Sequence, residues 1–159
     1  MITKVQRKEL ASTKDALKHE WMRKLLNIEI KIAEGSRLID NVKKRRIKEY
    51  SLSSQNRRKF LMYCIRAQLE NDHLLVTDLI KLVGVSRAAA ETMIKECEEA
   101  KWIKIKRGRG NRRRIQAADI TVETYADYCD WLWKLIYESD MRNLSASISE
   151  IEKLEQTLS

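Results

Sequence analysis

Seven lysines and arginines, and no acidic residue, lie between positions 104 and 114 of this sequence. So many like charges on a short segment repel one another, which favours a flexible chain or contact with a polyanion. Gly108 and Gly110 lie among them and would let the backbone approach a duplex closely. We therefore expect phosphate contacts here, through Lys104, Lys106, Arg107, Arg109, Asn111, Arg112, Arg113 and Arg114.

A second set of residues lies on a predicted helix that Ser86 caps and that runs from Arg87 to about Ala100. Arg87 has the geometry for a bidentate contact to guanine, and Ala88 could touch a thymine methyl group. Glu91 leaves two alternatives open: it could accept a hydrogen bond from cytosine, or pair with Arg87 or Lys95 of the same helix. The spacing places the base-contacting candidates on one exposed side: Ser86, Arg87, Ala88, Glu91, Thr92 and Lys95.

No comparable set of residues indicates catalysis. The two histidines, His19 and His73, are isolated, and the sequence has no phosphate-binding glycine loop or nucleophile motif. The three cysteines, Cys64, Cys97 and Cys129, form no CxxC pair, which disfavours zinc. Each falls within an apolar helical pattern, so we expect buried, reduced thiols. The sequence thus predicts no enzyme, no metal and no cofactor.

The elements that would position these two sets of residues have the pattern of a winged helix-turn-helix. Thr77 is expected to cap a short helix over 78–82, and Gly84 supplies a turn at positive φ before the second helix. From Trp102 the apolar period changes to two residues, which predicts a β-hairpin with strands over 102–106 and 112–117. This hairpin would be the wing.

Helical periodicity predicts further helices on both sides of this head. The first 50 residues read as helix, which Gly35-Ser36 breaks or kinks. The basic run at 43–48 is more typical of a solvated helix face than of phosphate contact. The last helices carry apolar stripes, and the absence of proline leaves long helices uninterrupted. Residues expected to cap the flanking helices are Ser53 or Ser54, Thr121, and Ser147 as part of a capping box with Glu150.

Charge is distributed unevenly along the chain. The formal net charge is +9, but residues 1–118 carry +15 and residues 119–159 carry −6. One part of the chain thus favours a polyanion and the other does not. No apolar run is long enough to span a membrane and no secretion signal begins the chain, so we expect a cytoplasmic, nucleoid-associated protein.

The flanking helices expose more apolar surface than one small head can cover. Because symmetric dimers are the commonest oligomers, we expect a homodimer joined by these helices. The alternative is a monomer that folds them onto its own head. The expected division is a dimerisation segment over 1–52, a DNA-binding head over 53–118 and completing helices over 119–159. The expected interface residues are Trp21, Leu25, Trp131, Trp133, Ile136, Ile151, Leu154 and Leu158.

In order and spacing, these features together resemble the MarR-type transcriptional regulators. The resemblance covers about residues 20–158 and rests on GVSRAAAETMIKECEEAKWIKI, the basic hairpin ending NRRRIQAADIT, and the closing LSASISEIEKLEQTL. It implies a mainly α winged helix-turn-helix fold flanked by dimerisation helices. The family usually has glycine where this chain has Lys101, and often Asp-x-Arg where it has Asn111 and Arg113.

The resemblance also implies an effector pocket between the head and the dimerisation helices. Trp21, Tyr63, Trp131 and Trp133 would line it, although hydrophobic core is the favoured interpretation of these residues. Some relatives sense oxidants through a cysteine, which the apolar surroundings of the cysteines here disfavour.

The leading hypothesis is a sequence-specific transcriptional regulator, more specifically a repressor, that binds a pseudo-palindromic site on double-stranded DNA as a homodimer. The alternative is a plasmid or phage partition, replication or architectural DNA-binding protein of the same fold. A pure interaction module would leave the +15 region unexplained.

Overall fold

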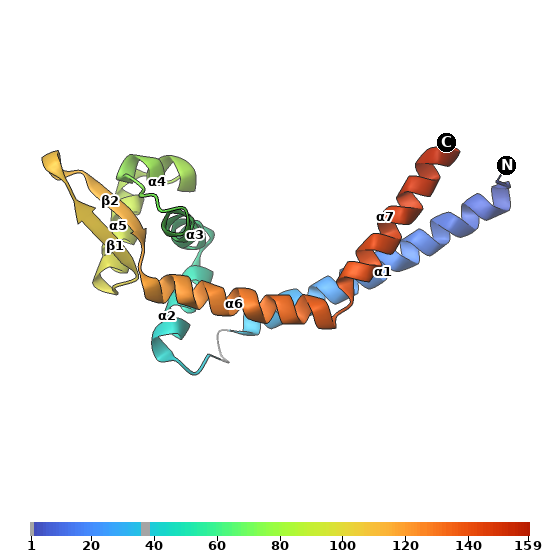
Figure 1. Cartoon of the computed structure of the whole chain (residues 1–159), viewed down its shortest axis with the longest axis horizontal. Coiled ribbons are helices and arrows are strands. Elements are labelled where there is room, and N and C mark those ends of the chain that lie inside the picture. The colour runs from blue at the N-terminus through green and yellow to red at the C-terminus, as the bar shows by residue number, and fades with distance from the viewer. Residues whose placement is uncertain (1, 36–38) are drawn as a thin grey trace. The chain divides into compact units, whose positions relative to one another are not determined.

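The computed structural model describes residues 2–35 and 39–159, which form a helical protein with one β-hairpin (Figure 1). Contacts divide the chain into two compact units, which we call the head (Ser36–Tyr128) and the terminal unit (Met1–Gly35 with Cys129–Ser159). The elements are α1 (Lys4–Glu34), α2 (Val42–Ser53), α3 (Gln55–Leu69), α4 (Val76–Val83), α5 (Arg87–Glu99), β1 (Ile103–Arg107), the short 3-10 turn η2 (Arg109–Asn111), β2 (Arg113–Ala117), α6 (Asp119–Glu138) and α7 (Met141–Leu158).

The head is larger than the segment 53–118 that the sequence suggested. Helix α2 belongs to it, because α2 packs against α3 and places Ile47 in the same core. The first half of α6 also belongs to the head, whereas its second half lies in the terminal unit. The functional division into DNA-binding and dimerisation parts stays a prediction.

One hydrophobic core holds the helix-turn-helix and the base of the hairpin together. Helix α3 supplies a stripe at helical spacing, and the inward residues of β1 and β2 close the core from the other side. Leu74 and Ile115 exchange two backbone hydrogen bonds of 2.8 Å, which attach the chain before α4 to β2. The largest fully buried side chains are Phe60, Leu79, Ile94, Ile115, Val83, Thr121, Cys64 and Cys97.

Only some of the helices in the head have the N-terminal capping residues that the sequence predicted. Ser54, rather than Ser53, caps α3, and its Oγ accepts from the Arg57 N–H at 3.1 Å. The Thr77 cap is wrong: α4 begins at Val76, and the Asp78 carboxylate accepts from the Leu75 N–H at 2.8 Å. An acid in the first helical turn thus accepts from the N–H of the residue before the helix, whereas a Thr77 cap would have accepted from an N–H two or three residues further along the chain.

Two further predicted caps are wrong because the residues lie inside helices. Thr121 is buried in the first turn of α6, where its hydroxyl donates to the Trp102 carbonyl at 2.7 Å. Ser147 lies within the continuous helix α7, and its hydroxyl donates to the Asn143 carbonyl at 3.0 Å. Short hydroxyl side chains can bond to the preceding helical turn as well as cap a helix.

The terminal unit is built on α1 and α7, which pack against each other (Figure 1). They run antiparallel, since Lys14 pairs with Glu155 and Lys18 pairs with Glu152 at 2.8 Å. Helix α1 ends at Glu34, so the predicted break is confirmed at Gly35, whereas Ser36 lies outside the described residues. Within the described part of the chain, no helix is long and apolar enough to cross a membrane.

Candidate nucleic-acid interface

Helix α5 is fixed at both ends and presents one polar side. Gly84 adopts the left-handed conformation predicted for the turn, with φ of 77°. The Ser86 Oγ then accepts from the Ala89 N–H at 3.1 Å, which confirms the predicted cap. The buried face of the helix consists of Ala90, Met93, Ile94 and Cys97, whereas Ser86, Arg87, Ala88, Thr92 and Lys95 are exposed and Glu91 is half-buried.

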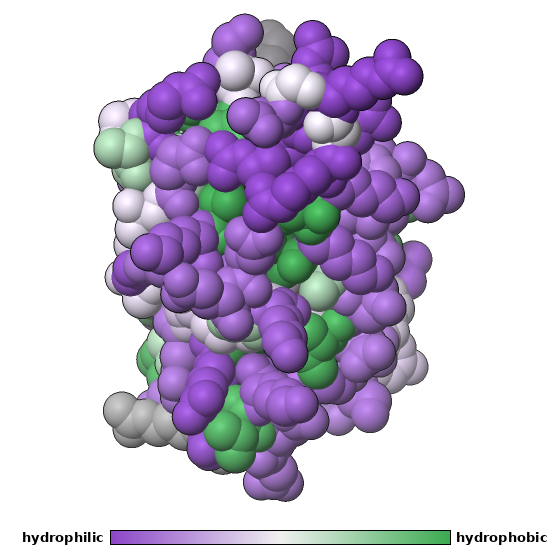
Figure 2. Space-filling view, turned by 90° about the vertical axis from the view of Figure 1, so that its left-hand side faces the viewer, coloured by the Kyte–Doolittle hydropathy of each residue, from purple (hydrophilic) through white to green (hydrophobic). Residues whose placement is uncertain are grey.

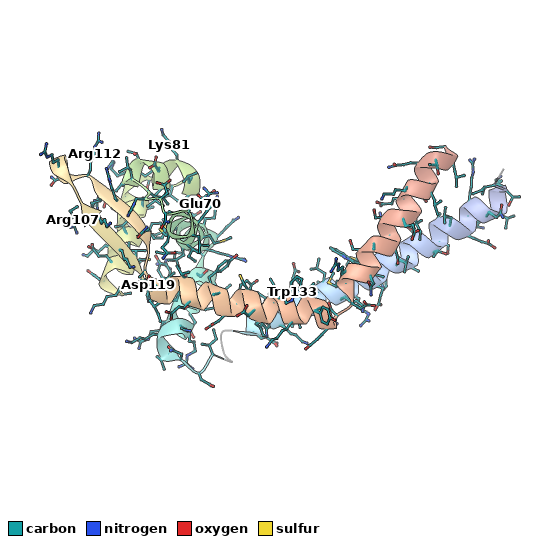
Figure 3. All side chains as sticks on the ribbon, in the orientation of Figure 1. Glu70, Lys81, Arg107, Arg112, Asp119 and Trp133 are labelled. Carbon is teal, nitrogen blue, oxygen red and sulfur yellow. The ribbon has the colours of Figure 1, made fainter. Side chains whose placement is uncertain are left out.

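Helix α4 carries a further exposed cation of the head that the sequence analysis did not single out. Lys81 is exposed on α4, the helix that precedes the turn. In Figure 3 it extends from the same edge of the head as Arg112 at the hairpin tip. The signal was available, because Thr77 and Lys81 share the polar face of a strongly amphipathic helix.

The hairpin has two chemically different faces. Its register pairs Ile105 with Ile115 and Arg107 with Arg113 on the face turned to the head, because neighbouring residues of a strand alternate between faces. On the outer face, Lys106 lies opposite Arg114. Both faces therefore carry a cross-strand pair of like charges, an arrangement that is unfavourable without a counter-charge.

Glutamates of α5 neutralise the inner pair. The Arg113 guanidinium donates to both carboxylate oxygens of Glu91, at 2.8 and 2.5 Å, and Arg107 pairs with Glu98 at 2.9 Å. The hydrogen bonds from Arg113 hold the pKa of Glu91 below its ordinary value, so the carboxylate is charged at neutral pH. The Arg87 guanidinium lies 4.0 Å from the same carboxylate.

On the outer face only Lys104 has an acidic partner, and the cations of the tip have none among the described residues. Lys104 pairs with Asp119 at 2.9 Å. Lys106, Arg109, Arg112 and Arg114 are exposed and form no ion pair with any residue in 2–35 or 39–159. Figure 2 looks onto the hairpin side of the head and shows a mostly hydrophilic surface with small, separate hydrophobic areas. Such a surface suits a polyanion rather than an apolar partner.

The tip turns tightly on two residues in the left-handed region. Gly110 has φ of 67° and Asn111 has φ of 57°. Asparagine adopts this conformation more readily than most residues. A Cβ at Gly110 would meet no atom within 4 Å, so only the backbone conformation favours glycine there. Asn111 therefore shapes the tip, and its contact with DNA stays a prediction.

Two of the five cations in the basic run on α2 are engaged within the head, whereas Lys43 and Arg46 are exposed. Lys44 pairs with Asp127 at 2.7 Å, and the Lys48 ammonium lies 4.1 Å from the centre of the Tyr128 ring. Desolvation lowers the pKa of Lys48, to which the neighbouring Arg58 charge also contributes. This run therefore helps to attach α2 to α6.

The cysteines differ from the prediction at one position. Cys64 and Cys97 are buried in the head core, whereas Cys129 is exposed. Burial raises the pKa of Cys97 to about 12 and also raises that of Cys64. Cys129 lies among apolar residues of α6, but no helix among the described residues covers its side chain. Among the described residues, no group of histidine, cysteine and carboxylate side chains could hold a metal ion.

A groove of about 460 Å³ lies between α3 and α6 within the head. It includes Tyr63, one of the four predicted effector-lining residues, whereas Trp21, Trp131 and Trp133 belong to the terminal unit. The Arg66 guanidinium lies 4.9 Å from the centre of the Tyr63 ring. The remaining lining residues are Lys59, Met62, Ile65, Leu69 and Tyr125.

Comparison with solved structures supports the fold. The chain is similar to MepR, a transcription regulator of the multidrug efflux pump MepA from Staphylococcus aureus. The match has 15% identity and a TM-score of 0.50, and covers 77% of this chain and 95% of MepR. The heme sensor PefR from Streptococcus agalactiae matches at 15% identity and a TM-score of 0.47, covering 84% of this chain and 90% of PefR.

The transcriptional regulator SlyA matches at 21% identity and a TM-score of 0.41, covering 84% of this chain and 93% of SlyA. No protein-family model matches the sequence, and no curated protein matches it either. The fold of the chain is thus the winged helix-turn-helix fold of MarR-type regulators, as the sequence patterns predicted.

Proposed function

We propose that this protein is a sequence-specific regulator of transcription that binds double-stranded DNA as a homodimer and represses by occupying a pseudo-palindromic site. One observation carries the proposal: the exposed side of α5 lies beside a hairpin whose Lys106, Arg109, Arg112 and Arg114 have no counter-charge among the described residues. A helix of this kind fits the major groove, and an adjacent basic hairpin suits phosphates or the minor groove. MepR, which has this fold, is itself a transcription regulator.

Selection of bound duplexes from a random pool, at stated salt concentration, tests the proposal. We expect one enriched motif with two-fold symmetry. The four uncompensated cations of each hairpin alone predict a slope of log affinity against log salt of roughly −4 per head. A slope near zero, or recovery of unselected sequences only, would contradict sequence-specific binding.

The two parts of the surface are expected to act differently. Arg87→Ala should lose about 1–3 kcal/mol at one base-pair position and relax the preference there, because a bidentate contact to guanine is lost. Arg112→Ser should weaken binding to all sequences by a similar factor and make the salt slope shallower by about one. If the two variants have the same effect, this division between base recognition and charge is wrong.

The homodimer is supported by apolar side chains that the terminal unit leaves uncovered. Within this unit only Ile28 and Met141 are buried among the described residues, whereas Trp133 is 66% exposed on α6 (Figure 3). Of the other predicted interface residues, Leu154 is exposed and Trp21, Leu25, Trp131, Ile136, Ile151 and Leu158 are partly buried. The prediction omitted the exposed side chains of Val5, Met22, Leu26, Ile30 and Tyr137.

Met22, Leu26 and Ile30 recur every four residues and so form one apolar stripe along α1. Light scattering after size exclusion should give twice the chain mass. Leu26→Glu should shift the protein towards the monomer, since a charge would enter the shared apolar surface. A wild-type mass equal to one chain would contradict the dimer.

An architectural, partition or replication protein is the second candidate. The uncompensated pair of Lys106 and Arg114 suits this candidate as well as a regulator, because the pair attracts phosphates of any sequence. Footprinting separates the candidates: one protected palindrome supports a regulator, whereas protection that spreads with concentration supports a coating protein. Under either candidate function, a small-molecule effector stays a proposal. The groove beside Tyr63 is its candidate site in the head.

A further inference from the structure

Glu91 is the only acidic residue between positions 86 and 95. It therefore places a negative charge in the middle of the surface that the proposed function directs at DNA phosphates. Such a charge opposes binding unless it is neutralised or has a structural role. Its side chain is 37% exposed, and the side chain of Arg113, whose guanidinium contacts both carboxylate oxygens, is 25% exposed.

The pair joins α5 to β2, since the two residues lie 22 positions apart in the chain. A second ion pair, between Glu98 and Arg107, joins α5 to β1. Each strand of the hairpin is thus attached to α5 by one arginine, and these two arginines face each other across the strands.

Hydrophobic packing does not extend as far as these pairs. Ile103, Ile115 and Ala117 are buried and Ile105 is half-buried, but no residue from Lys106 to Arg114 is buried. The core therefore holds the base of the hairpin and leaves its outer half without apolar anchorage. Bidentate pairing of arginine with carboxylate is directional, so it can fix the orientation of a segment that the core does not reach.

We propose that Glu91 and Arg113 are positioning residues that hold the basic tip at a fixed place relative to the base-contacting side of α5. This proposal rests on the proposed function and deepens it. Arg113 then acts through the hairpin rather than as a phosphate contact, and Glu91 acts through Arg113 rather than on cytosine. Arg112, Arg109 and the outer pair make the phosphate contacts.

The direction in which one substitution changes DNA affinity tests the proposal. Glu91→Gln removes a negative charge from the surface, so electrostatics alone would tighten binding to DNA. A positioning role predicts the opposite, a weakening of about tenfold for all sequences. Glu99→Gln is the matched control, because Glu99 is an exposed carboxylate of the same helix with no ion pair to a described residue. It should bind as the wild type does, or slightly tighter.

Two further measurements assign the effect to the hairpin. In an Arg112→Ser background, Glu91→Gln should have a smaller effect, since the tip that it positions has lost one of its phosphate contacts. The exchanged pair Glu91→Arg with Arg113→Glu should bind more tightly than either single variant, because it restores opposite charges. Equal effects in both backgrounds, or a changed base preference without general weakening, would overturn the positioning role.

Hydrogen exchange in the free protein separates this proposal from the proposed function. Glu91→Gln should increase amide exchange in β1 and β2 and leave α3 unchanged. Unchanged exchange in the hairpin would overturn the positioning role even if the wild type binds DNA well. If the wild type retains no duplex at moderate salt, the proposed function itself is overturned, together with this role in it.

Discussion

Replacing Lys101 by glycine should stabilise the head. Helix α5 ends at Glu99, and Lys101 follows with φ of 62°. The Lys101 N–H donates to the Glu98 carbonyl at 3.0 Å, and the Trp102 N–H donates to the Cys97 carbonyl at 2.8 Å. These bonds form a Schellman motif, in which the left-handed position usually belongs to glycine. MarR-type regulators, which the sequence resembles, usually have glycine here.

The expected gain follows from two opposing effects at this position. A left-handed conformation costs a residue other than glycine about 1–2 kcal/mol. Glycine loses more conformational freedom on folding than lysine does, and this entropic cost offsets about 0.5–1 kcal/mol of the gain. Lys101 is exposed and forms no ion pair with a described residue, so its side chain adds little. The net gain should be about 1 kcal/mol, or a rise of about 4–8 °C in the melting temperature of a domain of this size.

Urea unfolding followed by circular dichroism measures this gain. Lys101→Ala is the matched control, because it removes the same charge and keeps the strained backbone. It should give a midpoint close to that of the wild type. Gly84→Ala should lose about 1–2 kcal/mol, since Gly84 is also left-handed and an added Cβ would meet no atom within 4 Å. Equal midpoints for Lys101→Gly and Lys101→Ala would refute the reasoning.

Three further outcomes are expected. Ser86→Ala should lose about 1 kcal/mol in the same urea assay, because an N–H at the start of α5 loses its acceptor; Ser86→Gly should lose less. A thiol reagent should label Cys129 in the folded protein and reach Cys64 and Cys97 only on unfolding, and labelling of all three in the native state would contradict their burial. Since pairing lowers the pKa of Glu91, its contribution is complete above the ordinary value of 4.5 and is lost as pH falls through the lower value in the folded state. The protection factors of the hairpin amides should therefore fall in acid below about 4.5, and less so in Glu91→Gln.

The sequence was sufficient where structure depends on neighbours in the chain. Gly84, the Ser86 cap and the alternation from Trp102 onward are local signals, and each predicted the element that is observed. The predicted caps at Thr121 and Ser147 failed because a hydroxyl inside a helix has the same composition signal as one at its start. Only the course of the backbone distinguishes the two positions.

The arrangement of charges in the site could not be predicted without knowledge of the fold. A count of basic residues between 104 and 114 treats all of them alike, whereas the strand register sorts them into an inner and an outer face. The partner of Arg113 lies on another element, so a search for pairs within one helix offered Glu91 only Arg87 or Lys95. In the fold the hydrogen-bonded partner is Arg113, and Arg87 lies at the 4.0 Å limit of an ion pair.

Left-handed residues bound α5 on both sides, Gly84 before it and Lys101 after it. The helix can therefore neither gain nor lose a turn without breaking a cap, so its length is a fixed quantity of about 20 Å at 1.5 Å per residue. In the proposed function, a helix of constant length binds DNA sites that differ in groove width and curvature. The duplex would then make most of the adjustment, and the stiffness of base pairs that no side chain touches would influence which sites are bound.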